Sequence, residues 1–213
     1  MKTVIRSYCK IKNNAAWVNG NEIVITGDST DLTSFLSALY RQIAMSYPKF
    51  FKMDNLCKLG MLATELAIRN NADFEKYNRG RTAIVLSNNA SSIETDRNHI
   101  KTIADKSQYF PSPAVFVYTL PNIVIGEIGI KYKLTGENAF FVSEAFDAGL
   151  LHNYVSILLE NGHTDAVISG WVNVDGNAYD AFVYCVEKSN FNQHTEEVYQ
   201  PHTIEALQQL YNH

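Results

Sequence analysis

Short β-branched apolar runs alternate with longer segments of helical periodicity along most of this chain, and this alternation limits the possible folds more than any other feature. Four runs, at residues 81–88, 139–145, 165–174 and 179–187, are bounded by turn residues, as buried strands are. Strands that alternate with helices favour a mainly parallel sheet flanked by helices. We therefore expect an α/β fold with about five strands, in which the last two could form an antiparallel edge pair.

The helices are predicted mainly by the residues that begin and end them. Asp31 and Asp54 stand directly before segments 32–44 and 55–71, and an aspartate at this position caps free backbone N–H groups. Leucines recur at helical spacing through the second segment. A helix after residue 150 is expected to end at Gly162, because glycine adopts the left-handed conformation that terminates helices.

Three further segments need separate treatment. Segments 3–11 and 21–28 resemble strands, and the turn-like residues 13–20 between them suggest a hairpin. The apolar positions of segment 115–134 fit both the strand and the helix template, and we expect its second half to be helical.

Charge and hydropathy exclude several classes of protein. The net charge is -4 and no Lys- or Arg-rich block is present, so we expect no nucleic-acid partner. The apolar stretches are interrupted well short of the roughly 20 residues that span a membrane. The N-terminus has no apolar stretch typical of a signal peptide, so we expect a cytoplasmic protein.

Motifs for metals, cofactors and common nucleophiles are missing from the sequence. Neither GxGxxG nor GxxxxGKS occurs, and Ser143 does not lie in a GxSxG elbow, so no cofactor is expected and a serine hydrolase is disfavoured. The three cysteines are widely spaced and are interpreted as buried thiols. The histidines show no ligand spacing, and we expect most of them to be solvated or to cap helices: His99, His152, His163, His194, His202 and His213.

Four segments between residues 47 and 187 resemble the β-ketoacyl synthases, members of the thiolase-like superfamily. Segment 47–68 is similar to the family's Lys-Met-Asp entry to a helix, and 81–96 to the strand and loop that follow. Segment 110–138 resembles the family's proline-containing segment and helix, and 139–174 its nucleophile strand, elbow and long helix. The resemblance implies the N-terminal half of a thiolase-like fold, in residues 1–187, followed by a tail with a short helix in residues 188–213.

The resemblance also places the family's alanine–cysteine pair on Ala145 and Phe146. A ketosynthase needs a thiolate at this helix N-terminus, and a phenyl ring cannot replace it. Asp147 and Glu144 are expected to cap the helix. The family's C-terminal catalytic half is absent as well, so we expect a non-catalytic protein with a degenerate elbow.

Three hypotheses follow. The chain could be an accessory or chain-length-factor-like subunit that pairs with a full-length β-ketoacyl synthase. The partner would then bury an apolar face left by the missing half. The candidate interface residues are Phe140, Phe141, Val142, Ser143 and Glu144. It could instead associate with itself as a scaffold, or bind acyl carrier protein. It could also retain acyl-transfer or decarboxylase activity. A carrier protein would meet the cations Lys49, Lys52, Lys58 and Arg69.

Overall fold

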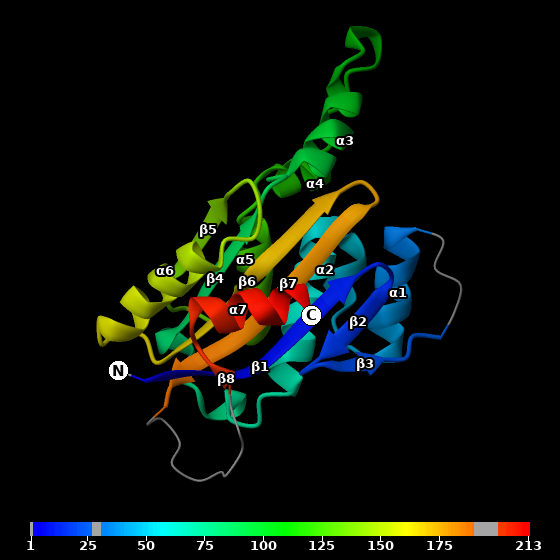
Figure 1. Ribbon diagram of the computed structural model, residues 1–213. Helices are drawn as coiled ribbons and strands as arrows, with labels where there is room; N and C mark the ends of the chain where they lie inside the picture. The colour runs from blue at the N-terminus through cyan, green and yellow to red at the C-terminus, as the bar shows by residue number, and fades with distance from the viewer. Residues whose placement is uncertain (1, 27–30, 190–199) are drawn as a thin grey trace.

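A computed structural model describes residues 2–26, 31–189 and 200–213. Among them, eight strands form one sheet in the order β3-β2-β1-β7-β6-β4-β5, with β8 paired to β1 (Figure 1). The strands are β1 (Thr3–Lys12), β2 (Ala15–Val18), β3 (Asn21–Ile23), β4 (Thr82–Asn88), β5 (Asn138–Val142), β6 (Ala166–Asp175), β7 (Ala178–Lys188) and β8 (Gln200–Pro201). The α-helices are α1 (Leu32–Gln42), α2 (Asn55–Arg69), α3 (Ile93–Ile103), α4 (Pro113–Phe116), α5 (Ile123–Tyr132), α6 (Ala148–Glu160) and α7 (Ile204–Asn212).

The α/β class is confirmed, but the sheet has eight strands rather than about five and is mixed rather than mainly parallel. Only β4 runs parallel to its neighbours, β5 and β6. The expected antiparallel pairing of β6 with β7 is present. This pair lies in the middle of the sheet rather than at its edge, because β1 pairs with the other side of β7 and adds the N-terminal strands there.

The N-terminal hairpin holds one strand more than expected. Asn13 and Asn14 have positive φ angles and close the β1–β2 turn, and Asn19 and Gly20 do the same between β2 and β3. Two-residue turns of this kind match the twist of antiparallel strands. The segment expected to be one long turn therefore contains two turns with β2 between them. Residues 27 and 28 of the expected second strand lie outside the described residues.

Most of the expected helix boundaries are confirmed. Asp31 accepts a hydrogen bond from the backbone N–H of Ser34, and Asp54 accepts one from that of Cys57, so both cap helices as predicted. The second half of the ambiguous segment is helix α5. Gly162, with a φ of 80°, follows Asn161, the C-cap residue of α6.

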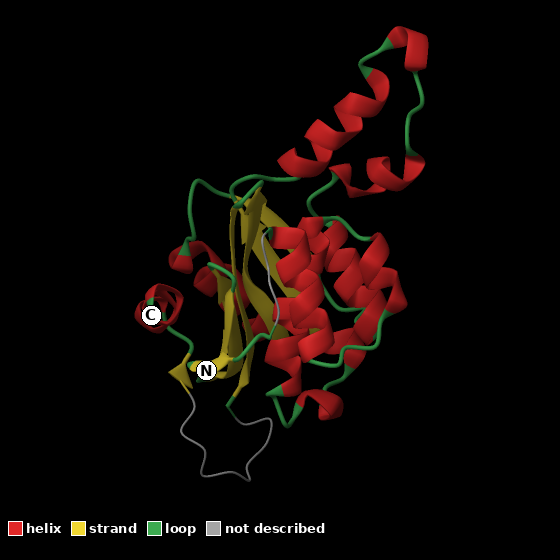
Figure 2. Cartoon of the chain, turned by 90° about the vertical axis from the view of Figure 1, so that its right-hand side faces the viewer, coloured by secondary structure: helices red, strands yellow, loops and turns green. Residues whose placement is uncertain are grey.

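Helices cover both faces of the sheet, as Figure 2 shows with the sheet seen edge-on. Helices α1, α2 and α5 bury one face with a large core that includes Phe35, Leu62 and Ile128. Helices α6 and α7 bury the opposite face, where Leu151 and Leu207 are fully buried. The chain therefore covers with its own C-terminal helix a face that we expected a partner to bury. Residues 190–199 of the predicted tail lie outside the described residues.

One part of the chain projects from this layered body. Helices α3 and α4 extend beyond the ends of β4 and β6, away from the sheet (Figures 1 and 2). Within the described residues no single helix has the length and apolar character to cross a membrane. Segments Pro113–Thr119 and Ile123–Tyr132 reach that length only as a pair, bent by 101°.

Candidate functional site

The predicted elbow lies where β5 ends and α6 begins. The backbone N–H of Ser143 continues the β5 ladder by donating to the Asn88 carbonyl, and the Ser143 hydroxyl donates to the Ala145 carbonyl at 3.0 Å. The Asp147 carboxylate then accepts from the Leu150 N–H at 2.9 Å and caps α6. This connection places residues 143–147 at the carboxyl end of parallel strands, where α/β folds commonly bind ligands.

The two elbow carboxylates have different roles. Asp147 is the N-cap of α6, as expected. Glu144 is exposed, and its backbone carbonyl, not its carboxylate, accepts a hydrogen bond from the Asn89 side chain at 3.4 Å. The expectation that both carboxylates cap the helix is therefore wrong for Glu144.

The Phe146 ring fills the space between the elbow and the C-terminal helix. It stacks on Tyr211 of α7, with 4.2 Å between ring centroids, and meets Phe182 edge-on at 5.7 Å and Trp171 at 6.5 Å. Offset and edge-to-face arrangements of this kind are the favourable ones for aromatic pairs. Phe146 is therefore part of the contact that holds α7 to the sheet.

Asp180 links the same groups through hydrogen bonds. Its carboxylate accepts from the Tyr211 hydroxyl at 2.6 Å and from the Trp171 ring nitrogen at 3.2 Å. Burial and the hydrogen bond to Asp180 raise the pKa of Tyr211, so its phenol remains a donor. We call Phe146, Trp171, Asp180, Phe182 and Tyr211 the elbow clasp.

None of the three cysteines lies at this elbow. Cys9, Cys57 and Cys185 are all free and buried in the strands and helix of the core. Burial raises the pKa of each thiol, that of Cys185 to about 12. A thiol with such a pKa stays protonated at neutral pH, and the thiolate is the nucleophilic form.

An open depression of about 650 Å³ lies over the elbow, with two carboxylates on its rim. It is lined by residues 143–149 together with Ile204 and Gln208. Glu144 and Asp147 give it negative charge, which opposes binding of a thiolate or phosphate there. In the described part of the chain, no group of three or more His, Cys, Asp or Glu side chains could hold a metal ion.

His202 is an exception to the expectation that most of the histidines are solvated or cap helices. Only 4% of it is exposed, and its ring lies 4.9 Å from that of His152 on α6 and 5.7 Å from that of Tyr184 on β7. Burial, with a smaller effect from His152, lowers the pKa of His202 to about 3. The neutral ring therefore packs at the start of α7. His194 lies outside the described residues.

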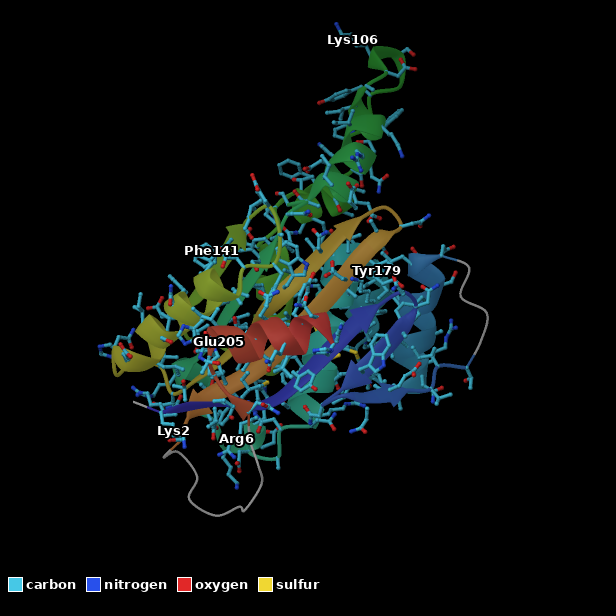
Figure 3. The ribbon with its side chains drawn as sticks, in the orientation of Figure 1. Lys2, Arg6, Lys106, Phe141, Tyr179 and Glu205 are labelled. Atoms are coloured by element: carbon cyan, nitrogen blue, oxygen red, sulfur yellow. The ribbon has the colours of Figure 1, made fainter. Side chains whose placement is uncertain are left out.

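The predicted interface strand β5 forms one edge of the sheet. It pairs with β4 on one side, and within the described residues no strand pairs with its outer side. The Phe141 ring, labelled in Figure 3, packs on Tyr154 of α6 with 5.0 Å between ring centroids. Phe140 packs against the core on the opposite face of the sheet. Val142 is 58% exposed.

The hydrogen bonds of β5 show which backbone groups are free. The Glu137 carbonyl accepts from Ile84, and the Ser143 N–H donates to Asn88. Because inward and outward groups alternate along a parallel strand, residues 137, 139, 141 and 143 bond to β4. The N–H and carbonyl groups of Asn138, Phe140 and Val142 consequently point outward.

A groove lined by both apolar and polar residues runs beside this strand. It has a volume of about 470 Å³ and lies between α5 and the strands β4 and β5, lined by residues that include Ile84, Ile123, Gly126, Ile130 and Asn138. Ile130 is 63% exposed, and there is open space at Gly126. We call β5 and this outer side of α5 the edge surface.

The predicted carrier-protein cations are in different states. Lys49 forms an ion pair with the buried Glu127 at 2.7 Å, and Arg69 forms one with Glu65 at 2.6 Å. Burial lowers the pKa of Lys58, whereas Lys52 is exposed. Two of the four charges are therefore neutralised within the chain. The elbow clasp and the groove beside α5 were not predicted.

Comparison with known proteins gives similarity in structure only. No family model and no curated protein sequence matches the chain. The ishigamide ketosynthase/chain length factor matches with a TM-score of 0.67 and 13% identity, over 91% of this chain and 64% of that one. A structure of a ketosynthase in complex with its chain length factor, from Xenorhabdus doucetiae, matches with a TM-score of 0.59 and 15% identity, over 100% of this chain and 91% of that one.

A type II polyketide synthase ketosynthase structure with its acyl-carrier protein matches with a TM-score of 0.60 and 13% identity, over 88% of this chain and 63% of that one. This chain thus spans less than two thirds of the first and third of these structures. Its fold is that of the thiolase-like ketosynthases, as the sequence resemblance implied.

Proposed function

We propose that this chain is a non-catalytic ketosynthase-like subunit that pairs with a full-length β-ketoacyl synthase through its edge surface. Its role would be that of an accessory or chain-length-factor-like protein in fatty-acid, polyketide or aryl-polyene-type biosynthesis. We place it in the cytoplasm, with residues 1–187 as the ketosynthase-like domain and residues 188–213 as an extension attached by α7.

The observation that carries the proposal is the aromatic ring at the elbow. Phe146 stacks on Tyr211, and Tyr211 is in turn hydrogen-bonded to Asp180. A nucleophile at this position would need an open path for its acyl donor and a group that lowers its pKa. Here the position lies beside an open depression but holds an apolar ring that stacks on α7 and cannot act as a nucleophile, so the elbow serves packing rather than covalent chemistry.

Pairing through the edge surface is supported by its unpaired backbone. Asn138, Phe140 and Val142 present outward N–H and carbonyl groups beside the groove under α5. An added strand would satisfy these groups, and its side chains would enter the groove. The match to nearly the whole length of one chain in a ketosynthase–chain length factor complex supports a partner of this kind.

A second candidate function is self-association as a scaffold, and the position of β5 at the edge of the sheet favours it. An antiparallel copy of β5 could pair about a two-fold axis through Phe140, so that Asn138 faces Val142 of the other copy. Acyl carrier protein is a further possible partner in either case. Of the predicted cations, Lys52 is exposed and outside the two ion pairs described above.

The deciding experiment is co-expression with each full-length ketosynthase of the same organism, followed by the mass of the purified complex in solution. We expect a stable mixed complex with one copy of each chain. A homodimer that ignores every ketosynthase would favour the scaffold, and a monomer would contradict both.

Two variants locate the contact. Val142→Lys adds a charge to the edge strand, and Val24→Lys, at a valine that is 75% exposed near the opposite edge, is the matched control. Only Val142→Lys should weaken the complex. Mass spectrometry of the chain after incubation with acyl and malonyl thioesters should show no adduct, and a covalent acyl group would contradict the non-catalytic role.

A further inference from the structure

Two asparagine–glycine pairs occur in the sequence, at residues 19–20 and 161–162. Asparagine before glycine readily loses its side-chain amide, because glycine turns freely and has no side chain to hinder attack by its own backbone nitrogen. Both asparagines are exposed. A difference in reactivity between the two pairs must therefore come from the contacts that the fold gives to each.

The fold anchors Asn19 to the neighbouring strand of the N-terminal hairpin. Its side-chain oxygen accepts from the Tyr8 N–H at 2.9 Å, and its own N–H donates to the Tyr8 carbonyl at 3.0 Å. The side chain of Asn19 must give up the first of these bonds before the Gly20 nitrogen can attack it. This loss raises the barrier to the reaction at Asn19.

Asn161 lies in a different setting, the turn between α6 and β6 at the left of Figure 1. Its side-chain oxygen accepts from the N–H of His163, two residues later, at 2.8 Å. This local bond folds the side chain over the backbone that follows it. Within the described residues the N–H of Gly162 donates no hydrogen bond, so its nitrogen is available for attack.

Arg81 fixes the peptide group that holds the Asn161 side chain. The guanidinium donates to the Gly162 carbonyl at 2.7 Å, and to the two carboxylate oxygens of Asp165 at 2.6 and 2.7 Å. The carbonyl of peptide 162–163 is thus bound by Arg81, while its N–H is bound by the Asn161 side chain. Hydrogen bonds linked in this way strengthen one another. A fixed N–H donor also stabilises the negative charge that develops on an oxygen during nucleophilic attack.

We propose that Asn161 is a self-modification site, at which the folded chain converts its own asparagine to aspartate and isoaspartate. The Gly162 nitrogen bonds to Cγ of Asn161, and the bond from Cγ to the side-chain nitrogen breaks. That nitrogen leaves as ammonia, which takes up the proton lost by Gly162. Water then opens the succinimide ring at either carbonyl and gives the two products. The His163 N–H is the oxyanion donor, and Arg81 is a positioning residue.

The reaction changes the end of α6 in two ways. Both products add a negative charge to a chain whose net charge is -4. Isoaspartate also lengthens the main chain by a carbon atom, which displaces the Gly162 carbonyl from Arg81. Because Arg81 directly precedes β4, the modified chain loses a link between the end of α6 and the sheet. This modification does not depend on the function proposed above.

Peptide mapping by mass spectrometry tests the proposal on the purified full chain, incubated at mildly alkaline pH. The same incubation in urea gives the intrinsic reactivity of each pair without the fold. After this correction, Asn161 in the folded chain should react about fivefold faster than Asn19, or more, because only Asn19 is tied to a neighbouring strand. Equal rates, or a faster reaction at Asn19, would overturn the proposal.

Arg81→Ala tests whether the fold assists the reaction or merely exposes the site. The substitution should lower the rate at Asn161 by about twofold or more and leave Asn19 unchanged. Arg79→Ala is the matched control, because Arg79 pairs with Glu75 instead. Circular dichroism confirms that each variant is folded, and the wild-type comparison stands without them. A rate at Asn161 that stays the same or rises in Arg81→Ala contradicts an assisted reaction.

Discussion

Replacing Phe146 by alanine should loosen the C-terminal helix and lower the stability of the whole chain. Complete truncation of a buried phenylalanine costs about 3–5 kcal/mol, and Phe146 is only half-buried, so we expect a loss of about 2–3 kcal/mol. That loss includes about 1 kcal/mol for its stacking on Tyr211. With a urea m-value of about 2.5 kcal/mol per molar, the unfolding midpoint should fall by about 1 M.

The assay is urea unfolding followed by tryptophan fluorescence, because Trp171 lies beside the Phe146 ring. Phe110→Ala is the matched control, and its loss should stay below about 0.5 kcal/mol because that ring is exposed. A double-mutant cycle with Tyr211→Ala should give a coupling energy of about 1 kcal/mol. The elbow clasp would be refuted if Phe146→Ala behaved like the control, or if the two substitutions were additive.

Three further predictions concern the core. The pKa of His202 is lowered in the folded state, so the stability is full above pH 6.5 and falls as the pH drops. Between neutral pH and pH 5, the wild type should lose about 2 kcal/mol more than the His202→Gln variant. Chemical unfolding at several pH values across that range would measure the difference. Glu187→Ala should lower the stability by about 3–5 kcal/mol, because it leaves the buried Arg6 without its salt bridge to Glu187. Calorimetry of both variants should show a smaller loss of stability for Glu187→Gln than for Glu187→Ala. Gly170→Ala should cost about 3 kcal/mol or more, because a Cβ there would lie 2.0 Å from the Phe182 carbonyl oxygen, and a thermal midpoint like that of the wild type would contradict this.

The features that could be read from the sequence are those fixed by neighbouring residues. Asp31 and Asp54 cap helices because an aspartate satisfies N–H groups within three residues of itself, and no distant contact is needed. Strands β4, β6 and β7 contain continuous apolar runs and are buried along most of their length, because both faces of this sheet are covered. The α/β class followed from these local signals.

The arrangement of the sheet depends on contacts between distant segments and could not be predicted in the same way. Strand β2 has four residues between two asparagine-containing turns, and its sequence alone resembles a loop. The central place of β7 follows from its pairing with β1, more than 150 residues earlier in the sequence. Local patterns do not determine which strands become neighbours.

The candidate site was predicted in part. The order of strand, elbow and helix in the sequence placed Phe146 just before α6, but the packing of α7 on its ring was not predicted. Ala206, Leu207 and Leu210 give α7 an apolar side that the sequence displays, whereas its position under Phe146 depends on Tyr211 reaching Asp180. A short amphipathic helix can be recognised from its pattern, but the surface that it covers cannot.

The edge strand β5 also has a consequence for the chain before it meets any partner. Natural proteins protect the outer strands of a sheet with lysines, prolines or bulges, because an unprotected strand recruits strands from other molecules. The sequence of β5, Asn-Ala-Phe-Phe-Val, contains no charge and no proline. Newly made chains should therefore aggregate when produced in excess and remain dispersed when their partner is made in equal amount. The proportion in which the two proteins are synthesised would then set how much of this one survives in the cell.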